Sequence, residues 1–163
     1  MLVLRPADGT ETLVAWKMAL ENKETPTALL LSRQNINDLP FTAEKSRYSE
    51  ALSAHKGAYI LQKDEGKIDV VLVASGSEVS TLVEAAAILR NEKGLKLQIV
   101  SAISEGLFRL QEKSYQHTVI PENIPVIALT AGLPVTMSGF VGHNGKVIGL
   151  EHFGYSAPAK ILD

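Results

Sequence analysis

The sequence contains no cysteine among its 163 residues. That absence excludes disulfides, iron–sulfur clusters, thiolate nucleophiles and every zinc site that depends on sulfur ligands. Any chemistry performed by the side chains must therefore come from histidine, carboxylates, arginine or serine, or else from a cofactor.

A surplus of charge of one sign is also missing. The 16 basic and 18 acidic residues leave a formal net charge of −2. Proteins that gather nucleic acid or anionic lipid through long-range electrostatics carry a clear positive excess. We therefore expect no nucleic-acid partner.

Long apolar runs are missing as well. No stretch approaches the roughly 18 to 20 apolar residues that a membrane-spanning helix needs. The N-terminus has no basic segment ahead of its short apolar stretch, as a secretory signal would have. The composition, 45% hydrophobic and 21% charged, is typical of a globular protein. We therefore expect a cytoplasmic protein with no membrane partner.

The beginning of the chain predicts a strand followed by a capped helix. The apolar segment 2–4 ends at a proline, which cannot donate a ladder hydrogen bond. Asp8 and Glu11 then have the spacing of a capping box, in which the two side chains bind free amides of the first helical turn. The pattern behind them predicts one helical face made by Leu13, Trp16, Lys17 and Leu20.

An unbroken apolar run follows within residues 26–33. Runs without alternation are typical of strands that are covered on both faces, as in a parallel sheet between helices. The next segment, 37–57, is polar with isolated apolar residues, and it is longer than ordinary connections in α/β proteins. We therefore predict a linker over 37–57 that separates two packing units.

The second unit, 58–163, predicts a strand–helix–strand repeat. Residues 68–74 form the strongest strand pattern, and Ser75 and Glu78 again have capping-box spacing. A helix ending at Gly94 and a strand over 95–100 follow, which together predict a right-handed crossover between parallel strands. The buried face of this helix is predicted to comprise Val79, Leu82, Val83, Ala86 and Leu89.

The remaining pattern completes an α/β fold. We predict further strands over 58–62, 126–130 and 147–150, an amphipathic helix over 107–117 and a hairpin-type turn over 142–145. Ser156-Ala157-Pro158 predicts a helix start about one turn before the last residue, so we expect its continuation to be missing. The predicted fold is a mainly parallel, twisted sheet flanked by helices and preceded by a partial α/β segment.

Arg33 is the candidate binding residue. It stands at the carboxyl end of the predicted strand 26–33, where open α/β sheets place ligand-binding groups. A guanidinium there offers forked donors that suit a phosphate or a carboxylate. Position and composition alone leave equally open a surface arginine that pairs with a nearby acid.

Other chemical motifs are weak. The turn Ser75–Glu78 offers amides for an anion, but we favour a plain capped turn because neither glycine-rich phosphate motif is present. No G-x-S-x-G elbow marks a serine nucleophile. No helical pairing joins His55, His117, His143 and His152, so we predict no metal site and no catalytic residue within this chain.

Six short segments stand in one order along nearly the whole chain: Arg5-Pro6-Ala7-Asp8, Ala15-Trp16-Lys17, Ser32-Arg33-Gln34-Asn35, Gly57-Ala58-Tyr59, Ser75-Gly76-Ser77-Glu78-Val79 and Phe153-Gly154-Tyr155-Ser156-Ala157-Pro158. In this order they resemble the sequences of transketolases. Each segment is short, and their common order makes the resemblance specific.

The resemblance implies a parent enzyme that moves a two-carbon ketol unit between sugar phosphates, with thiamine diphosphate and a divalent metal, Mg²⁺ or Ca²⁺, in a homodimer. Residues 1–36 would be the end of its pyrimidine-binding domain, and 58–163 its C-terminal domain. The family's Gly-Asp-Gly…Asn motif for the metal and diphosphate is absent. We therefore expect a fragment that binds no cofactor and is inactive alone, with a role in packing and dimer support.

The resemblance also implies a role for Arg33, since the arginine of Ser-Arg-Gln-Asn in the family binds the terminal phosphate of the sugar. Two alternatives stay open. In the first alternative, the parent is another thiamine-dependent enzyme, such as dihydroxyacetone synthase, deoxyxylulose-phosphate synthase or a 2-oxo-acid dehydrogenase β subunit. Alternatively, the chain is a stand-alone α/β binding or regulatory module without catalytic chemistry.

Overall fold

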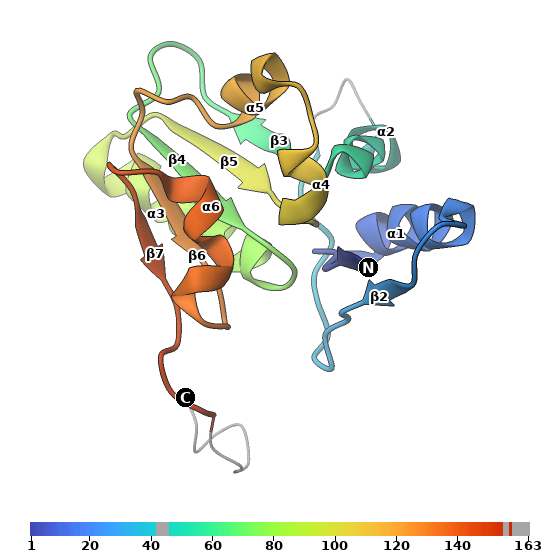
Figure 1. Cartoon of the computed structure of the whole chain (residues 1–163). Helices are drawn as coiled ribbons and strands as arrows, with labels where there is room; N and C mark the ends of the chain where they lie inside the picture. Colours follow the sequence, from blue (N-terminus) through green and yellow to red (C-terminus); the bar gives the residue numbers. More distant parts are fainter. Residues whose placement is uncertain (42–45, 155–156, 158–163) are drawn as a thin grey trace.

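The N-terminal region forms a small two-stranded sheet beside a helix (Figure 1). A computed structural model describes residues 1–41, 46–154 and 157. Strand β1 (Leu2–Leu4) pairs in parallel with β2 (Thr27–Leu29), and helix α1 (Gly9–Glu21) connects them. Asp8 caps α1 by accepting a hydrogen bond from the Glu11 amide at 2.7 Å, as the capping pattern predicts.

The predicted linker interval 37–57 contains regular structure. It holds helix α2 (Arg47–Ala51), continued by the 3₁₀ turn η1 (Leu52–Lys56). Leu39, Ala51 and Ala54 are buried and belong to the same apolar cluster as residues of α1 and of the larger sheet. The segment therefore joins the N-terminal region to the rest of the chain through a shared core.

The described part of the second unit is built on a five-stranded sheet with the order β3-β5-β4-β6-β7. Its strands are β3 (Tyr59–Lys63), β4 (Val70–Ala74), β5 (Leu97–Ser101), β6 (Val126–Leu129) and β7 (Lys146–Ile148). Only the β3–β5 pair is antiparallel, and the other three pairs are parallel. The prediction of a mainly parallel α/β sheet is therefore confirmed.

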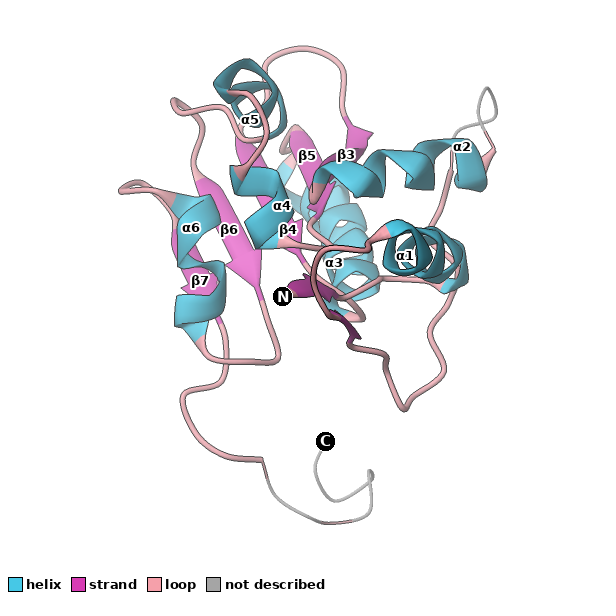
Figure 2. Ribbon diagram, turned by 45° about the vertical axis from the view of Figure 1, so that its right-hand side comes forward, coloured by secondary structure: helices cyan, strands magenta, loops and turns pink. Residues whose placement is uncertain are grey.

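Helices cover both faces of this sheet (Figure 2). Alternate residues of β4 point to opposite sides, because side chains alternate along a strand. Leu72 and Ala74 join the core beneath α3 (Glu78–Lys93), which continues to α1. Val71 and Val73 join a second core. The helices over that core are α4 (Glu105–Arg109), α5 (Lys113–Val119) and α6 (Ser138–Val141), the last preceded by the 3₁₀ turn η2 (Pro134–Met137).

Helix α3 follows its sequence pattern closely. Val79, Leu82 and Ala86 are buried, and Gly94 ends the helix in the left-handed conformation at φ 66°. The predicted capping box of this helix is wrong, however, because Ser77 is the N-cap residue and makes no side-chain capping bond. The Glu78 carboxylate instead forms a long-range ion pair with Arg5, at 2.7 Å.

The predicted apolar face of α1 is also wrong. Leu13, Trp16 and Leu20 are exposed, whereas Glu11, Val14 and Ala15 are buried. The buried face packs against α2 and η1. Helical spacing identified a periodic set of apolar residues, but tertiary contacts bury a different face of the helix.

Three shorter predictions also need correction. The strand expected within 26–33 covers only Thr27–Leu29 and is half-buried, because β1 is its one partner strand among the described residues. The helix expected over 107–117 is split into α4 and α5. The turn at 142–145 links α6 to β7, which runs parallel to β6, so it closes no hairpin. The helix start expected at 156–158 lies outside the described residues, apart from Ala157.

Candidate functional site

Arg33 lies in the loop after β2, four residues beyond the end of the strand, and is exposed. The Ser32 hydroxyl donates to the Gln34 carbonyl oxygen at 3.0 Å, which shapes a local bend around Arg33. Arg33 forms no ion pair or hydrogen bond with any of the described residues. The prediction that placed Arg33 directly at the end of a buried strand is therefore corrected, while its guanidinium is available to solvent and to an anion.

The carboxyl ends of three parallel strands meet at one edge of the larger sheet. Ala74 is opposite both Ser101 and Leu129 in the strand register. The residues that follow these strand ends, Ser75, Ala102 and Thr130, consequently lie side by side. In open α/β sheets, the crevice outside the carboxyl ends of the strands is where ligands bind.

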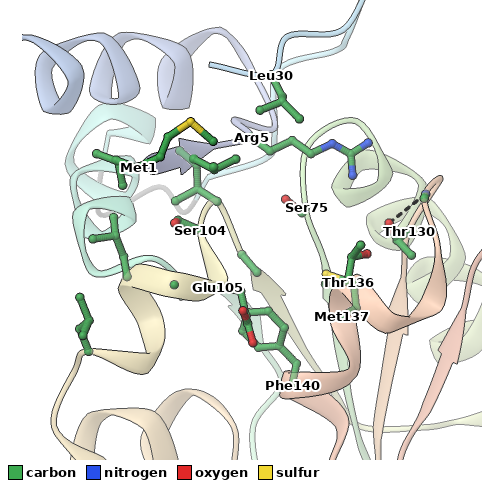
Figure 3. A pocket seen from close by; sticks show the side chains of 18 of the residues that line it. Met1, Arg5, Leu30, Ser75, Ser104, Glu105, Thr130, Thr136, Met137 and Phe140 are labelled. Atoms are coloured by element: carbon green, nitrogen blue, oxygen red, sulfur yellow. Dashed lines mark hydrogen bonds between the residues drawn. The ribbon is translucent and has the colours of Figure 1, made fainter. Parts of the chain in front are cut away.

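A cavity of about 940 Å³ opens at this edge, between the strand ends and the N-terminal region (Figure 3). We call it the strand-end cavity. Its N-terminal side includes Val3, Arg5 and Leu30, and its other walls come from the segments after β4, β5 and β6 and from η2 and α6. The further lining residues used below are Ser75, Ser104, Glu105, Leu107, Thr130, Met137 and Phe140.

The charged side chains of Arg5 and Glu105, which line this cavity, are already paired. Arg5 Nη2 lies 2.7 Å from Glu78 Oε2, and Glu105 forms an ion pair with Arg109 one helical turn later. The Ser75–Glu78 turn, weighed as an anion site from the sequence, thus contributes a carboxylate that already faces a cation. The four residues together carry no net charge.

A second polar site, missed by the sequence analysis, is buried between the N-terminal region and the larger sheet. We call it the Glu11 cluster, and it comprises Asp8, Glu11, Arg47, Tyr59 and Ser101. Glu11 Oε1 accepts hydrogen bonds from the Tyr59 and Ser101 hydroxyls, both at 2.7 Å. Tyr59 and Ser101 are cross-strand partners of β3 and β5, so the sheet aims both donors at one oxygen.

Arg47 supplies the positive charge of the Glu11 cluster. Its Nε donates to Asp8 Oδ2 at 2.7 Å, and its Nη2 donates to Glu11 Oε1 at 3.3 Å. Burial lowers the pKa of Arg47, but Tyr59 and the bond to Asp8 outweigh burial and raise it. Burial, followed by the charge of Glu11, raises the pKa of Tyr59. The raised pKa values favour an arginine cation and a neutral phenol in this cluster.

The sequence contained a partial signal for this cluster. Asp8 and Glu11 have capping-box spacing, but the Glu11 carboxylate accepts from the Ala7 amide at 2.8 Å and reaches three further side chains. Arg47 comes from the interval taken as a linker, and Ser101 from the end of a strand. Only the tertiary fold brings residues 36 to 90 positions apart to one carboxylate.

The histidines do not come together as ligands. No group of three or more His, Cys, Asp or Glu side chains with the placement of a metal site exists among residues 1–41, 46–154 and 157. His117 instead lies 3.0 Å from Glu122 in an exposed pair. In the same described ranges, no helix is long and apolar enough to cross a membrane.

Comparisons with known proteins identify relatives over almost the whole chain. The family model of the transketolase-like TK C-terminal domain matches residues 57–163. Transketolase 2 of Vibrio parahaemolyticus is 42% identical over 159 residues, which make up 97% of this chain and 23% of that protein. The chain thus spans about a quarter of the length of the relatives that it matches.

Solved structures show the same relationship. The transketolase from Leishmania mexicana is similar with a TM-score of 0.83 and 37% identity, covering 98% of this chain and 22% of its own. A mutant transketolase from Pichia stipitis, solved in complex with xylulose-5-phosphate, is similar with a TM-score of 0.83 and 35% identity, over 98% and 22% of the two chains.

Proposed function

This chain belongs to the transketolase family, and from that premise we propose that it serves as the C-terminal portion of a transketolase in which Arg33 binds the substrate phosphate. The parent enzyme would transfer a two-carbon ketol unit from a ketose phosphate to an aldose phosphate. The observation that carries the proposal is Arg33 itself, an exposed cation with no ion-pair partner among the described residues, set in the motif Ser32-Arg33-Gln34-Asn35.

The chemistry of Arg33 supports a phosphate as its ligand. A guanidinium presents parallel N–H donors that match two phosphate oxygens, and these charge-assisted bonds are stronger than neutral ones. The Pichia stipitis relative is described in complex with xylulose-5-phosphate, which is a sugar phosphate. By gripping the far end of such a sugar, Arg33 would orient the other end for reaction.

Thiamine diphosphate and Mg²⁺ or Ca²⁺ belong to the parent enzyme in this proposal. The described residues do not fit a metal–diphosphate site, because they contain no group of three or more His, Cys, Asp or Glu side chains placed as ligands. We therefore derive no catalytic step from this chain. We propose that the 163-residue chain alone does not transfer ketol units, and that the parent is a cytoplasmic homodimer.

The test is a whole transketolase that carries this chain as its C-terminal portion. Arg33→Ala should raise the KM for xylulose-5-phosphate by about 10- to 150-fold, since a hydrogen bond to a charged group contributes about 1.5–3 kcal/mol. The KM for an unphosphorylated ketose should stay unchanged. Steady-state kinetics with both substrates separates the two effects.

Two variants act as controls for Arg33→Ala. Arg33→Lys retains the charge without the forked donors, and it should give an intermediate KM. Lys67→Ala removes a different exposed cation, and it should alter neither KM. An equal rise of KM for phosphorylated and unphosphorylated sugars would contradict phosphate binding by Arg33.

A further inference from the structure

We propose that the strand-end cavity binds an uncharged aromatic molecule that carries hydroxyl groups. The cavity has a volume of about 940 Å³, at the upper end of the range of about 300–1,000 Å³ that is usual for small-molecule sites. It lies outside the carboxyl ends of β4, β5 and β6, where the fold class places ligands. Three features of its walls define the class of molecule: hydroxyls without protein partners, a side formed by aromatic and other apolar side chains, and charged side chains that form ion pairs.

Two serine hydroxyls at the cavity lack protein partners. Ser75 and Ser104 are each only 8% exposed, and neither side-chain hydroxyl forms a hydrogen bond with another of the described residues. Ser104 precedes α4 but makes no capping bond there. Neither Ser75 Oγ nor Ser104 Oγ is among the fully buried polar atoms without a partner, so both hydroxyls are reached from the cavity. They are therefore available to hydrogen-bond with a ligand there.

The hydroxyl of the neighbouring Thr130, in the same cavity wall, does have a hydrogen-bond partner in the protein. Its Oγ1 accepts a hydrogen bond from the Gly132 amide at 3.1 Å. Figure 3 shows Ser75 and Ser104 between the side of the cavity that holds Arg5 and the side that holds Met137 and Phe140. A ligand that touches the serines would therefore also contact the apolar side.

The apolar side suits a flat ring. Met137 and Phe140 are nearly buried yet line the cavity, together with Leu107. The Phe140 ring stacks on Phe108, with centroids 5.5 Å apart and an interplanar angle of 24°. This stack holds Phe140 in place, and both an aromatic ring and a methionine side chain pack favourably against a second ring.

The ion pairs at the cavity make an anion an unfavourable ligand. Arg5 is neutralised by Glu78, and Glu105 by Arg109. A phosphate placed beside Arg5 would compete with the Glu78 carboxylate and would experience its repulsion. The fitting molecule is therefore uncharged, in contrast to the phosphate that we propose for Arg33.

The test uses adenosine as the probe, because it joins a flat ring to hydroxyl groups without a charge. The methyl groups of all three methionines in the 163-residue chain are labelled and followed by NMR during a titration. Met137 and Met1 line the cavity, whereas Met18 belongs to α1, is half-buried against the core and does not line the cavity. We expect saturable shifts for Met137 and Met1, and none for Met18.

Serine variants connect the binding to the two hydroxyls. Ser75→Ala and Ser104→Ala should each weaken adenosine binding by about threefold to tenfold, the effect of one neutral hydrogen bond. Ser114→Ala removes an exposed hydroxyl of α5 that does not line the cavity, and it should leave the affinity unchanged.

Charged and ring-free probes complete the experiment. Adenosine monophosphate should bind more weakly than adenosine, while inorganic phosphate and ribose should shift neither Met137 nor Met1. The proposal is overturned if adenosine produces no saturable shift, if Met18 shifts together with Met137, or if adenosine monophosphate or phosphate binds at least as tightly as adenosine.

Discussion

The Glu11 cluster and the strand-end cavity are both polar sites at the boundary between the N-terminal region and the larger sheet, but they differ in how their polar groups are paired. In the Glu11 cluster, four donors converge on the two oxygens of one carboxylate. In the cavity, the Ser75 and Ser104 hydroxyls have no partner among the described residues. Serine hydroxyls occur in both sites, but they are hydrogen-bonded within the protein only in the Glu11 cluster.

This difference distinguishes a structural polar site from a binding one. The buried hydrogen bonds of the Glu11 cluster fix the relative positions of the elements that they join, here α1, α2, β3 and β5, although Arg47 Nη1 is buried without a partner among the described residues. Hydroxyls that face a cavity without a protein partner instead stay available to a ligand, and removing them breaks no hydrogen bond among the described residues. Substitutions should therefore have opposite consequences at the two sites.

The largest effect is expected at Glu11. Glu11→Ala leaves Arg47 with only Asp8 as its acid and removes the acceptor of two hydroxyls, so the free energy of unfolding should fall by about 3–5 kcal/mol. Urea denaturation followed by circular dichroism measures the change. Glu21→Ala, which removes an exposed carboxylate of the same helix, should have almost no effect. Similar losses for the two variants would show that the cluster does not hold the regions together.

A smaller effect is expected for Tyr59→Phe, which removes one hydroxyl and keeps the ring. Its hydroxyl donates to a charged carboxylate, so the free energy of unfolding should fall by about 1.5–3 kcal/mol. Tyr115→Phe is the matched control, because the Tyr115 hydroxyl donates to the neutral Ala58 carbonyl oxygen and should contribute about 0.5–1.5 kcal/mol. An equal loss of unfolding free energy for both variants would show that the Tyr59 bond to Glu11 is no stronger than an ordinary neutral hydrogen bond.

The Tyr59 bond also makes stability depend on pH. The raised pKa of Tyr59 means that the folded chain retains the phenol proton at a pH where the unfolded chain, with a pKa of about 10, releases it. The stabilisation is therefore fully present below pH 10 and is lost as the pH rises further. Burial raises the pKa of Tyr115 in the same direction. Denaturation curves at increasing alkaline pH should show a shallower decline for Tyr59→Phe.

The smallest effect on stability is expected in the cavity. Without a ligand, Ser75→Ala and Ser104→Ala break no hydrogen bond within the described chain, so each should leave the Tm unchanged or raise it slightly. Thr130→Val provides the contrast, because it removes the acceptor of the Gly132 amide and should lower the Tm. A clear fall of Tm for the two serine variants would make them structural residues like those of the Glu11 cluster.

Local patterns predicted much of the fold of the second unit. The buried face of α3, its end at Gly94 and the parallel strands on either side of it agree with the sequence. These features depend on neighbouring residues, on helical periodicity and on the conformational freedom of one glycine. Arg33 was likewise found from its sequence context, and its binding role stays a prediction.

The same patterns failed where distant segments decide the outcome. The spacing of Leu13, Trp16 and Leu20 is as regular as that of the buried face of α3, yet these side chains are exposed. Glu78 pairs with Arg5, 73 positions earlier, rather than capping its own helix. In each case, the burial of a face or the partner of a charge depends on contacts that no local window of sequence contains.

The family, the mainly parallel α/β fold and the motif around Arg33 could be read from the amino-acid sequence, because they follow from residue order and short-range periodicity. The common burial of Glu11 and Arg47, and the position of Ser75 and Ser104 at a cavity without partners among the described residues, became visible only in the folded chain. Hydrogen-bond partners and cavities arise where segments far apart in the chain meet. Their geometry depends on the packing of whole elements, and the same serine or glutamate is structural or available to a ligand according to what packs beside it.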